Sequence, residues 1–113
     1  PVMGGGIVLK YNANQRYTTD GVTAALFRKV CQQAQVPVQT YYNRADLPGG
    51  STLGNISLSH VSVPSVDIGL PQLAMHSCYE TAAVRDALYL EEAMSAYYSS
   101  TLECKNGSTF CLK

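Results

Sequence analysis

The sequence has few charged residues and no excess of either sign. Lys and Arg total 8, Asp and Glu total 8, and together these residues make up 14% of the 113 positions. Proteins that bind nucleic acid or an anionic membrane surface ordinarily carry a basic patch that tips this balance. The zero formal net charge therefore argues against both kinds of partner.

Long hydrophobic runs are also missing. The apolar stretches are far shorter than the roughly 20 residues that a membrane-spanning helix needs, and no basic leader precedes an apolar segment near Pro1. We therefore expect a soluble chain with no membrane partner and no signal peptide. An apolar run begins almost at once without an initiating Met, so we also expect the chain to be part of a longer one.

The cysteines lack the patterns of a metal or disulfide framework. The four of them show neither paired C-x-x-C spacing nor the density of a disulfide-stabilised fold. We therefore predict a reducing, cytoplasmic setting. Cys31 falls within a helical pattern, where it is expected to act as a small buried apolar residue.

Hydrophobic periodicity predicts strand, helix and strand over the first 42 residues. Residues 7–11 alternate as in a mostly buried strand, and the segment 18–20 offers N-cap residues to the helix that follows. Pro37 ends that helix, and the β-branched and aromatic segment 38–42 is typical of a second strand. The apolar positions of the helix are Val22, Leu26, Val30 and Ala34.

The second half predicts two further helices around a third strand. Gly49–Gly50 is a turn leading to a helix that begins at Ser51 or Thr52 and ends near residue 60. Residues 66–70 alternate as a strand, and residues 86–98 form the last helix. The predicted order is β-α-β-α-β-α, an α/β sandwich with a mostly parallel sheet. Ligands bind beyond the carboxyl ends of parallel strands, so the candidate residues should gather at one edge.

The tail at residues 100–113 lacks a helical period. Asn106–Gly107 is a hairpin turn signal, although the same residues begin a formal glycosylation acceptor. Counted outward from a two-residue turn, Cys104 lies opposite Thr109, which disfavours a disulfide to Cys111.

His76 is the first candidate functional residue. It follows the apolar run "DIGLPQLAM" and precedes Ser77, Cys78 and Glu80. A lone histidine is more often a core residue whose ring nitrogens are satisfied by the backbone, because one imidazole does not specify a metal site. The Gly and Pro before His76 predict an irregular exit from the strand, which favours a position at the sheet edge.

Lys10 and Tyr17 are the other two candidates. Lys10 interrupts an apolar strand, where it either points to solvent from an edge strand or receives an anionic substrate group. Tyr17 lies between strand and helix, where either its aromatic ring packs on the domain or its hydroxyl hydrogen-bonds a substrate or a developing oxyanion.

Two further patterns give weaker support for a functional site. The segment "PGGST" at residues 48–52 could bind an anion at a helix N-terminus but lacks a nucleotide-binding signature, so a tight turn is the simpler interpretation. Ser77 beside His76 lacks the G-x-S-x-G context of a serine hydrolase.

Three stretches together resemble the carboxyl-terminal part of the aspartyl aminopeptidase family of two-metal exopeptidases. They are "GIVLKYNANQRYTTD", "NRADLPGGSTLGNISLS" and "SVDIGLPQLAMHSCYET", in that order and spacing. The likeness covers roughly residues 4–99.

The resemblance implies a catalytic α/β domain with a β-rich domain inserted upstream. It implies two zinc ions held by histidines and carboxylates, and a glutamate as general base. His76 corresponds to a metal ligand, and Lys10 and Tyr17 to residues that contact the substrate and its acidic side chain. The remaining ligands and the glutamate would lie before Pro1.

We therefore predict a segment of a zinc aminopeptidase that releases amino-terminal Asp or Glu, inactive by itself and homo-oligomeric as part of a longer chain. Residues 1–99 would belong to the catalytic domain and residues 100–113 to a tail. The alternative is a non-catalytic α/β module that serves binding or assembly.

Overall fold

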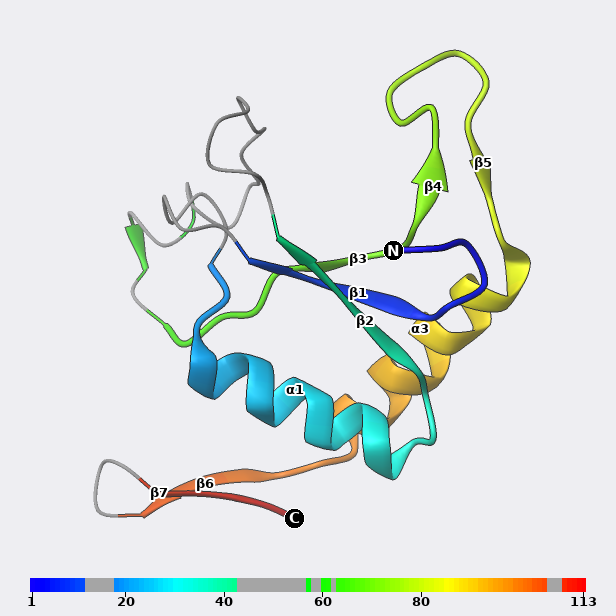
Figure 1. Cartoon of the computed structure of the whole chain (residues 1–113). Helices are drawn as coiled ribbons and strands as arrows, with labels where there is room; N and C mark the ends of the chain where they lie inside the picture. The colour runs from blue at the N-terminus through cyan, green and yellow to red at the C-terminus, as the bar shows by residue number, and fades with distance from the viewer. Residues whose placement is uncertain (12–17, 43–56, 58–59, 62, 106–108) are drawn as a thin grey trace.

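The computed structural model describes residues 1–11, 18–42, 57, 60–61, 63–105 and 109–113 (Figure 1). These residues form both helices and strands, which confirms the prediction of a mixed α/β fold. The predicted helix ending near residue 60 falls largely outside the described residues. The described elements are β1 (Ile7–Tyr11), α1 (Gly21–Gln33), β2 (Val38–Tyr42), β3 (Ile68–Gly69), β4 (Gln72–Leu73), β5 (Thr81–Ala82), α3 (Val84–Tyr98), β6 (Leu102–Lys105) and β7 (Thr109–Leu112).

The central sheet has the strand order β2-β1-β3. β1 and β2 are parallel, with Ile7 opposite Val38, as the predicted strand-helix-strand unit requires. β3 is antiparallel to β1, with Leu9 opposite Ile68. The prediction of a mostly parallel sheet is therefore wrong for β3, because apolar alternation indicates which residues are buried but not which way a strand runs.

α1 begins at the position that the sequence predicts. The Thr23 backbone N–H donates to Asp20 Oδ1 at 2.8 Å, and the Asp20 N–H donates to Thr23 Oγ1 at 3.1 Å. This reciprocal pair is a capping box, which satisfies two backbone donors at the helix start. Val30 of the predicted apolar face is buried together with Phe27 and Cys31, whereas Val22 is 50% exposed, so the prediction is confirmed only in part.

α3 covers almost the predicted range, but its buried face differs from the one that the sequence predicts. The apolar residues of that predicted face are Ala87, Leu90, Met94, Tyr97 and Tyr98. Leu90 and Met94 pack against the core as expected, whereas Tyr98 is 79% exposed. The fully buried residues of α3 are Asp86 and Ala93. Neither α1 nor α3 is long and apolar enough to cross a membrane.

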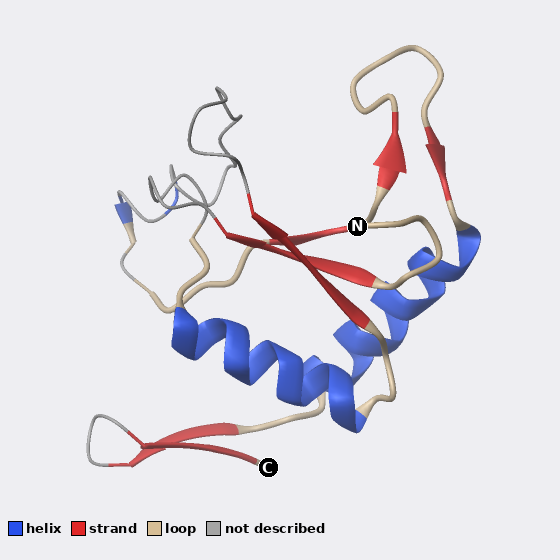
Figure 2. Cartoon of the chain, viewed as in Figure 1, coloured by secondary structure: helices blue, strands red, loops and turns tan. Residues whose placement is uncertain are grey.

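Both helices lie on one face of the sheet (Figure 2). Ile7 and Leu9 of β1 are fully buried and form the core with Phe27 of α1 and Ala93 of α3. Side chains alternate along a strand, so Lys10 lies on the other face. A sandwich with helices on both faces is not seen among the elements described above.

A two-stranded antiparallel sheet, β6–β7, forms the tail. Lys105 pairs with Thr109 and Cys104 with Phe110, so three residues separate the strands and not the predicted two. The expected pairing of Cys104 with Thr109 is therefore shifted by one residue. Cys111 pairs with Glu103, which puts Cys104 and Cys111 on opposite faces, and both are free thiols.

Gly6 allows the chain to enter β1, and its replacement is a direct test of this packing. Gly6 has φ +102°, and a Cβ there would lie 2.1 Å from the carbonyl oxygen of Pro37. We expect Gly6→Ala to lower the free energy of unfolding by at least about 2 kcal/mol, because strain and overlap add. Urea denaturation measures the change.

Gly21→Ala is the matched control for Gly6→Ala. A Cβ at Gly21 meets nothing within 4 Å, and the residue lies in the first turn of α1. Alanine favours a helix over glycine by up to about 1 kcal/mol, so Gly21→Ala should be neutral or stabilising. Equal destabilisation by the two substitutions would contradict the packing described for Gly6.

Candidate functional site

His76 lies at the tip of the β4–β5 hairpin. The hairpin projects from the side of the sheet that α1 and α3 leave uncovered (Figure 1). β4 and β5 pair through Gln72 with Ala82 and Leu73 with Thr81, and His76 in the connecting loop is exposed. The interpretation of His76 as a core histidine is therefore wrong for this structure. Its imidazole is accessible to a ligand from outside this chain.

The hairpin loop holds His76 in an uncommon backbone conformation. Ala74 has φ +55° and His76 has φ +68°, a region that costs residues other than glycine roughly 1–2 kcal/mol each. Two hydrogen bonds support the turn. The Ser77 N–H donates to the Ala74 carbonyl at 3.0 Å, and the His76 N–H donates to the Glu80 carboxylate. Such strain persists where the surroundings fix the turn, and it often marks a functional residue.

Ser77 takes part in the same turn. Its Oγ donates to the Tyr79 carbonyl at 2.9 Å and accepts from the Tyr79 N–H at 3.2 Å. A hydroxyl used in this way stabilises the loop. The structure thus gives Ser77 a structural role and adds no support for a serine hydrolase.

Lys10 lies in the central strand of the sheet and is partly buried. Its backbone N–H donates to the Asp67 carbonyl at 3.0 Å. A Cβ added at Gly69 would lie 2.9 Å from Lys10 Cε and 3.2 Å from Nζ, so the lysine side chain runs across Gly69. β1 is the central strand, so the interpretation of Lys10 as a residue of an edge strand is wrong.

Lys10 and His76 share a face of the sheet but not an edge. Lys10 lies near the carboxyl end of β1, whereas β3 runs antiparallel and leads toward the amino end of β1 before it reaches the hairpin. The expectation of one common edge is wrong for this reason. Tyr17 and the segment 48–52 lie outside the described residues.

His76 fits a metal ion as one ligand of several. No three His, Cys, Asp or Glu side chains in the described part of the chain lie close enough to hold a metal together. Structural and catalytic zinc sites use three or four protein ligands. An exposed imidazole at a hairpin tip is suited to completing a site whose other ligands come from elsewhere.

Known proteins identify the family of this chain. The family of aminopeptidase I zinc metalloproteases (M18) matches residues 1–98. The chain belongs to the M18 family. A probable M18 family aminopeptidase 2 of Pseudomonas paraeruginosa is 48% identical over 101 residues, which cover 89% of this chain and 24% of that protein. Its counterpart in Pseudomonas savastanoi pv. phaseolicola is 46% identical over 100 residues.

Two solved structures resemble the M18 chain in fold. The cryo-EM structure of the Ape4 and Nbr1 complex gives a TM-score of 0.84 at 40% identity, covering 87% of this chain and 19% of that one. The crystal structure of prApe1 gives a TM-score of 0.79 at 26% identity, covering 88% and 21%. The M18 chain therefore spans about a quarter of the length of the relatives that it matches.

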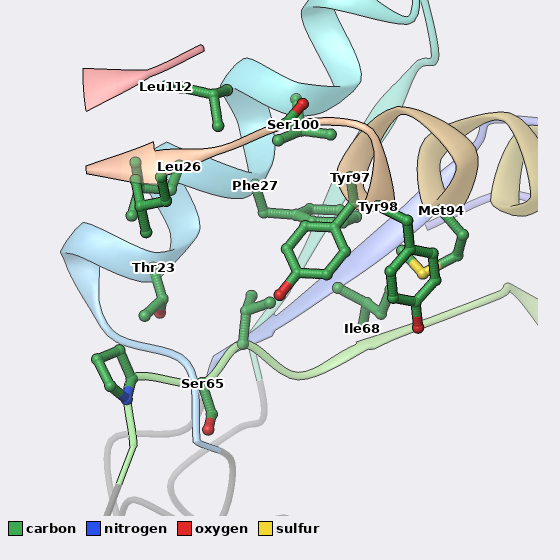
Figure 3. A pocket seen from close by; sticks show the side chains of 14 residues that line it. Thr23, Leu26, Phe27, Ser65, Ile68, Met94, Tyr97, Tyr98, Ser100 and Leu112 are labelled. Carbon is green, nitrogen blue, oxygen red and sulfur yellow. The ribbon is translucent and has the colours of Figure 1, made fainter. Parts of the chain in front are cut away.

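A hollow of about 680 Å³ opens on the helical side of the M18 chain (Figure 3), and neither Lys10 nor His76 lines it. Leu26 and Phe27 of α1, Met94 of α3 and Leu112 of β7 contribute to its wall. The described residues that line it include no Asp, Glu, His, Lys or Arg. Hydrolysis of an amide needs groups that activate water and stabilise charge, so this hollow is not the candidate catalytic site.

Cys31 behaves as the sequence predicts. The thiol is fully buried, and burial raises its pKa from 9.0 to about 11 against a smaller opposing effect of the Arg28 guanidinium. The neutral thiol is therefore the form present near pH 7, and it acts as a small apolar group in the core of the M18 chain.

Asp86 is a fully buried acidic residue that the helical periodicity did not single out. Its carboxylate is fully buried and accepts hydrogen bonds from the Gly4 N–H at 2.8 Å and the Gly6 N–H at 3.0 Å. The sequence offered one signal, because Asp86 lies on the same helical ridge as Leu90 and Ala93. A carboxylate on an apolar ridge requires a partner, and here the partner is a segment 80 or more residues away.

Proposed function

We propose that the chain forms part of an M18 aminopeptidase that releases amino-terminal Asp or Glu from peptides with the help of two zinc ions. The observation that carries the proposal is the face of the sheet opposite α1 and α3, which has a lysine in its central strand and a histidine on a projecting hairpin. Family membership supports zinc and peptide hydrolysis. The acidic specificity and the number of ions remain proposals.

His76 would supply one imidazole to a zinc ion. When bound, zinc supplies Lewis-acid polarisation of the scissile carbonyl and activation of a water molecule. The loop between β4 and β5 orients His76, since the His76 N–H is held by Glu80 and the following residue by Ala74. A general base and further ligands would come from the part of the protein outside this chain.

Lys10 would receive the acidic side chain of the substrate. An ammonium on a partly buried strand pairs strongly with a carboxylate, because charge-assisted hydrogen bonds strengthen away from bulk water. Its side chain is guided across Gly69, where the absence of a Cβ leaves it room. Tyr17 would contact the same substrate, and this role rests on the sequence motif.

Further parts of the proposal concern the whole protein. The relatives are about four times as long as this chain, so the segment alone would be inactive. Residues 1–99 would belong to the catalytic domain and residues 100–113 to a tail. A homo-oligomeric enzyme in the cytoplasm is the arrangement that the sequence predicts.

A matched set of peptides tests the proposal against a binding or assembly role. The full-length protein is incubated with zinc and peptides that differ only in an amino-terminal Asp, Glu, Asn, Gln or Leu, and released amino acids are measured. We expect preferential release of Asp or Glu. Release of no residue would favour the non-catalytic module, and preference for Leu would refute the acidic specificity.

A further inference from the structure

The Asp86 carboxylate joins two distant parts of the chain. It accepts from the Gly4 N–H at Oδ2 and from the Gly6 N–H at Oδ1, at 2.8 Å and 3.0 Å, and it is 0% exposed. Hydrogen bonds to a buried carboxylate are stronger than neutral ones, and loss of the acceptor leaves buried donors without a partner. The segment before β1 is thereby attached to the first turn of α3.

The same contact connects one strand of the β4–β5 hairpin, which carries His76, to the amino end of β1. α3 begins two residues after β5, and the Asp86 N–H donates to the Ala83 carbonyl at 3.2 Å. β5 pairs with β4, and β4 begins three residues after the end of β3. β3 pairs with β1 through Val8 and Gly69. Both legs of the hairpin therefore lead back to the amino end of β1, one through β3 and one through Asp86.

Within the described part of the chain, few other features hold the hairpin. β4 and β5 are two residues each, and an isolated two-stranded hairpin is only marginally stable. Leu73 is 58% exposed and Tyr79 is 82% exposed, so these hairpin side chains contribute little packing. The direction in which the hairpin projects thus depends on its two attachments at the base.

We propose that Asp86 is a positioning residue for His76. Its two hydrogen bonds fix the β5 leg against the segment of Gly4 and Gly6, and the hairpin then holds the imidazole where a zinc ion can bind it. This inference rests on the proposed function, in which His76 is a zinc ligand. Residues that orient a metal ligand affect metal affinity without touching the ion.

The test compares two aspartates of the full-length protein, both of which lie at the start of a helix and accept hydrogen bonds from backbone N–H groups. Asp86→Ala removes the attachment of the hairpin, and Asp20→Ala removes the cap of α1. Zinc affinity is measured by competition with a chromogenic chelator, and hydrogen exchange is measured at residues 74–80 in the metal-free protein. His76→Asn is measured alongside.

Asp86→Ala should weaken zinc binding by about 10-fold or more and speed exchange at residues 74–80. Asp20→Ala should lower the Tm but leave zinc affinity within about twofold, since capping stabilises the helix and not the hairpin. Zinc affinity and exchange that stay unchanged in a folded Asp86→Ala protein would overturn the inference. If Asp86→Ala does not fold, the isosteric Asp86→Asn, which keeps one acceptor oxygen, is held to the same two criteria.

The His76→Asn arm separates the inference from the proposed function. Unchanged zinc affinity in His76→Asn would refute the assignment of His76 as a ligand. The exchange rates at residues 74–80 would then still decide whether Asp86 fixes the hairpin. If His76→Asn weakens zinc binding but Asp86→Ala does not, the assignment of His76 as a ligand is supported and the role of Asp86 is refuted.

Discussion

Replacement of His76 by Asn in the full-length protein should lower zinc affinity by at least about 100-fold and abolish most peptidase activity. The substitution removes one imidazole that binds the ion directly. Even residues that only hydrogen-bond to a metal ligand change metal affinity by about 10–100-fold when they are replaced, so loss of a ligand should have a larger effect. Asn suits this test because it tolerates the left-handed backbone of His76, φ +68°. Equilibrium zinc binding and hydrolysis rate are the measurements.

His60→Asn is the control for His76→Asn. His60 is the other histidine of the chain and is exposed. Its replacement should leave zinc affinity and hydrolysis within about twofold, because an exposed surface substitution ordinarily has little effect. Equal losses for the two substitutions would show that His76 has no special role.

Replacement of Lys10 by Met should reduce kcat/KM for an amino-terminal Asp or Glu by about 100-fold. The substitution keeps an unbranched side chain that can cross Gly69 but removes the charge. A hydrogen bond between charged groups away from bulk water is worth roughly 1.5–3 kcal/mol, which corresponds to a factor of about 10–150. Peptides with amino-terminal Leu should be hydrolysed at an unchanged rate, because they have no carboxylate side chain to pair.

Lys29→Met controls for the general effect of removing a lysine. Lys29 is exposed on α1, on the side of the sheet away from Lys10. The Lys29 variant should retain both the rate and the preference for acidic substrates. If Lys10→Met slows hydrolysis of acidic and neutral substrates to the same extent, Lys10 supports the fold or the reaction in general and does not select the substrate.

Local sequence signals predicted most of the secondary structure. β1, α1, β2 and α3 follow from alternation, a helical period, an N-cap at Asp20 and the break at Pro37. These signals act over a few residues, and a single sequence displays them directly. The direction of β3 was not predictable in this way, because pairing with β1 depends on contacts between segments some 60 residues apart.

The candidate site shows the same division between local and distant information. The irregular exit before His76 was correctly interpreted as a position outside the core, since Gly and Pro disturb a strand locally. The wrong direction of β3 then led to the wrong expectation that Lys10 and His76 meet at one edge. The sequence of β1 does not show that a strand lies on each side of it, because β2 and β3 come from other parts of the chain. An edge position for Lys10 was therefore compatible with the sequence.

The role of Asp86 is not predictable from the sequence for a related reason. The helix dipole already accounts for an acidic residue in the first turn of a helix, so the sequence does not indicate a distant partner. The partners of Asp86 are the backbone N–H groups of Gly4 and Gly6. Nearly every residue has a backbone N–H group, so the sequence does not indicate which of these groups bind Asp86.

The most direct test of the central claim is the metal dependence of hydrolysis. The full-length protein is dialysed exhaustively against a chelator, assayed on peptides with amino-terminal Asp or Glu, and assayed again after zinc is restored. A zinc aminopeptidase should lose the activity on dialysis and regain it with zinc, because both polarisation of the carbonyl and activation of water depend on the ion. Hydrolysis that persists at full rate after complete metal removal would contradict the account.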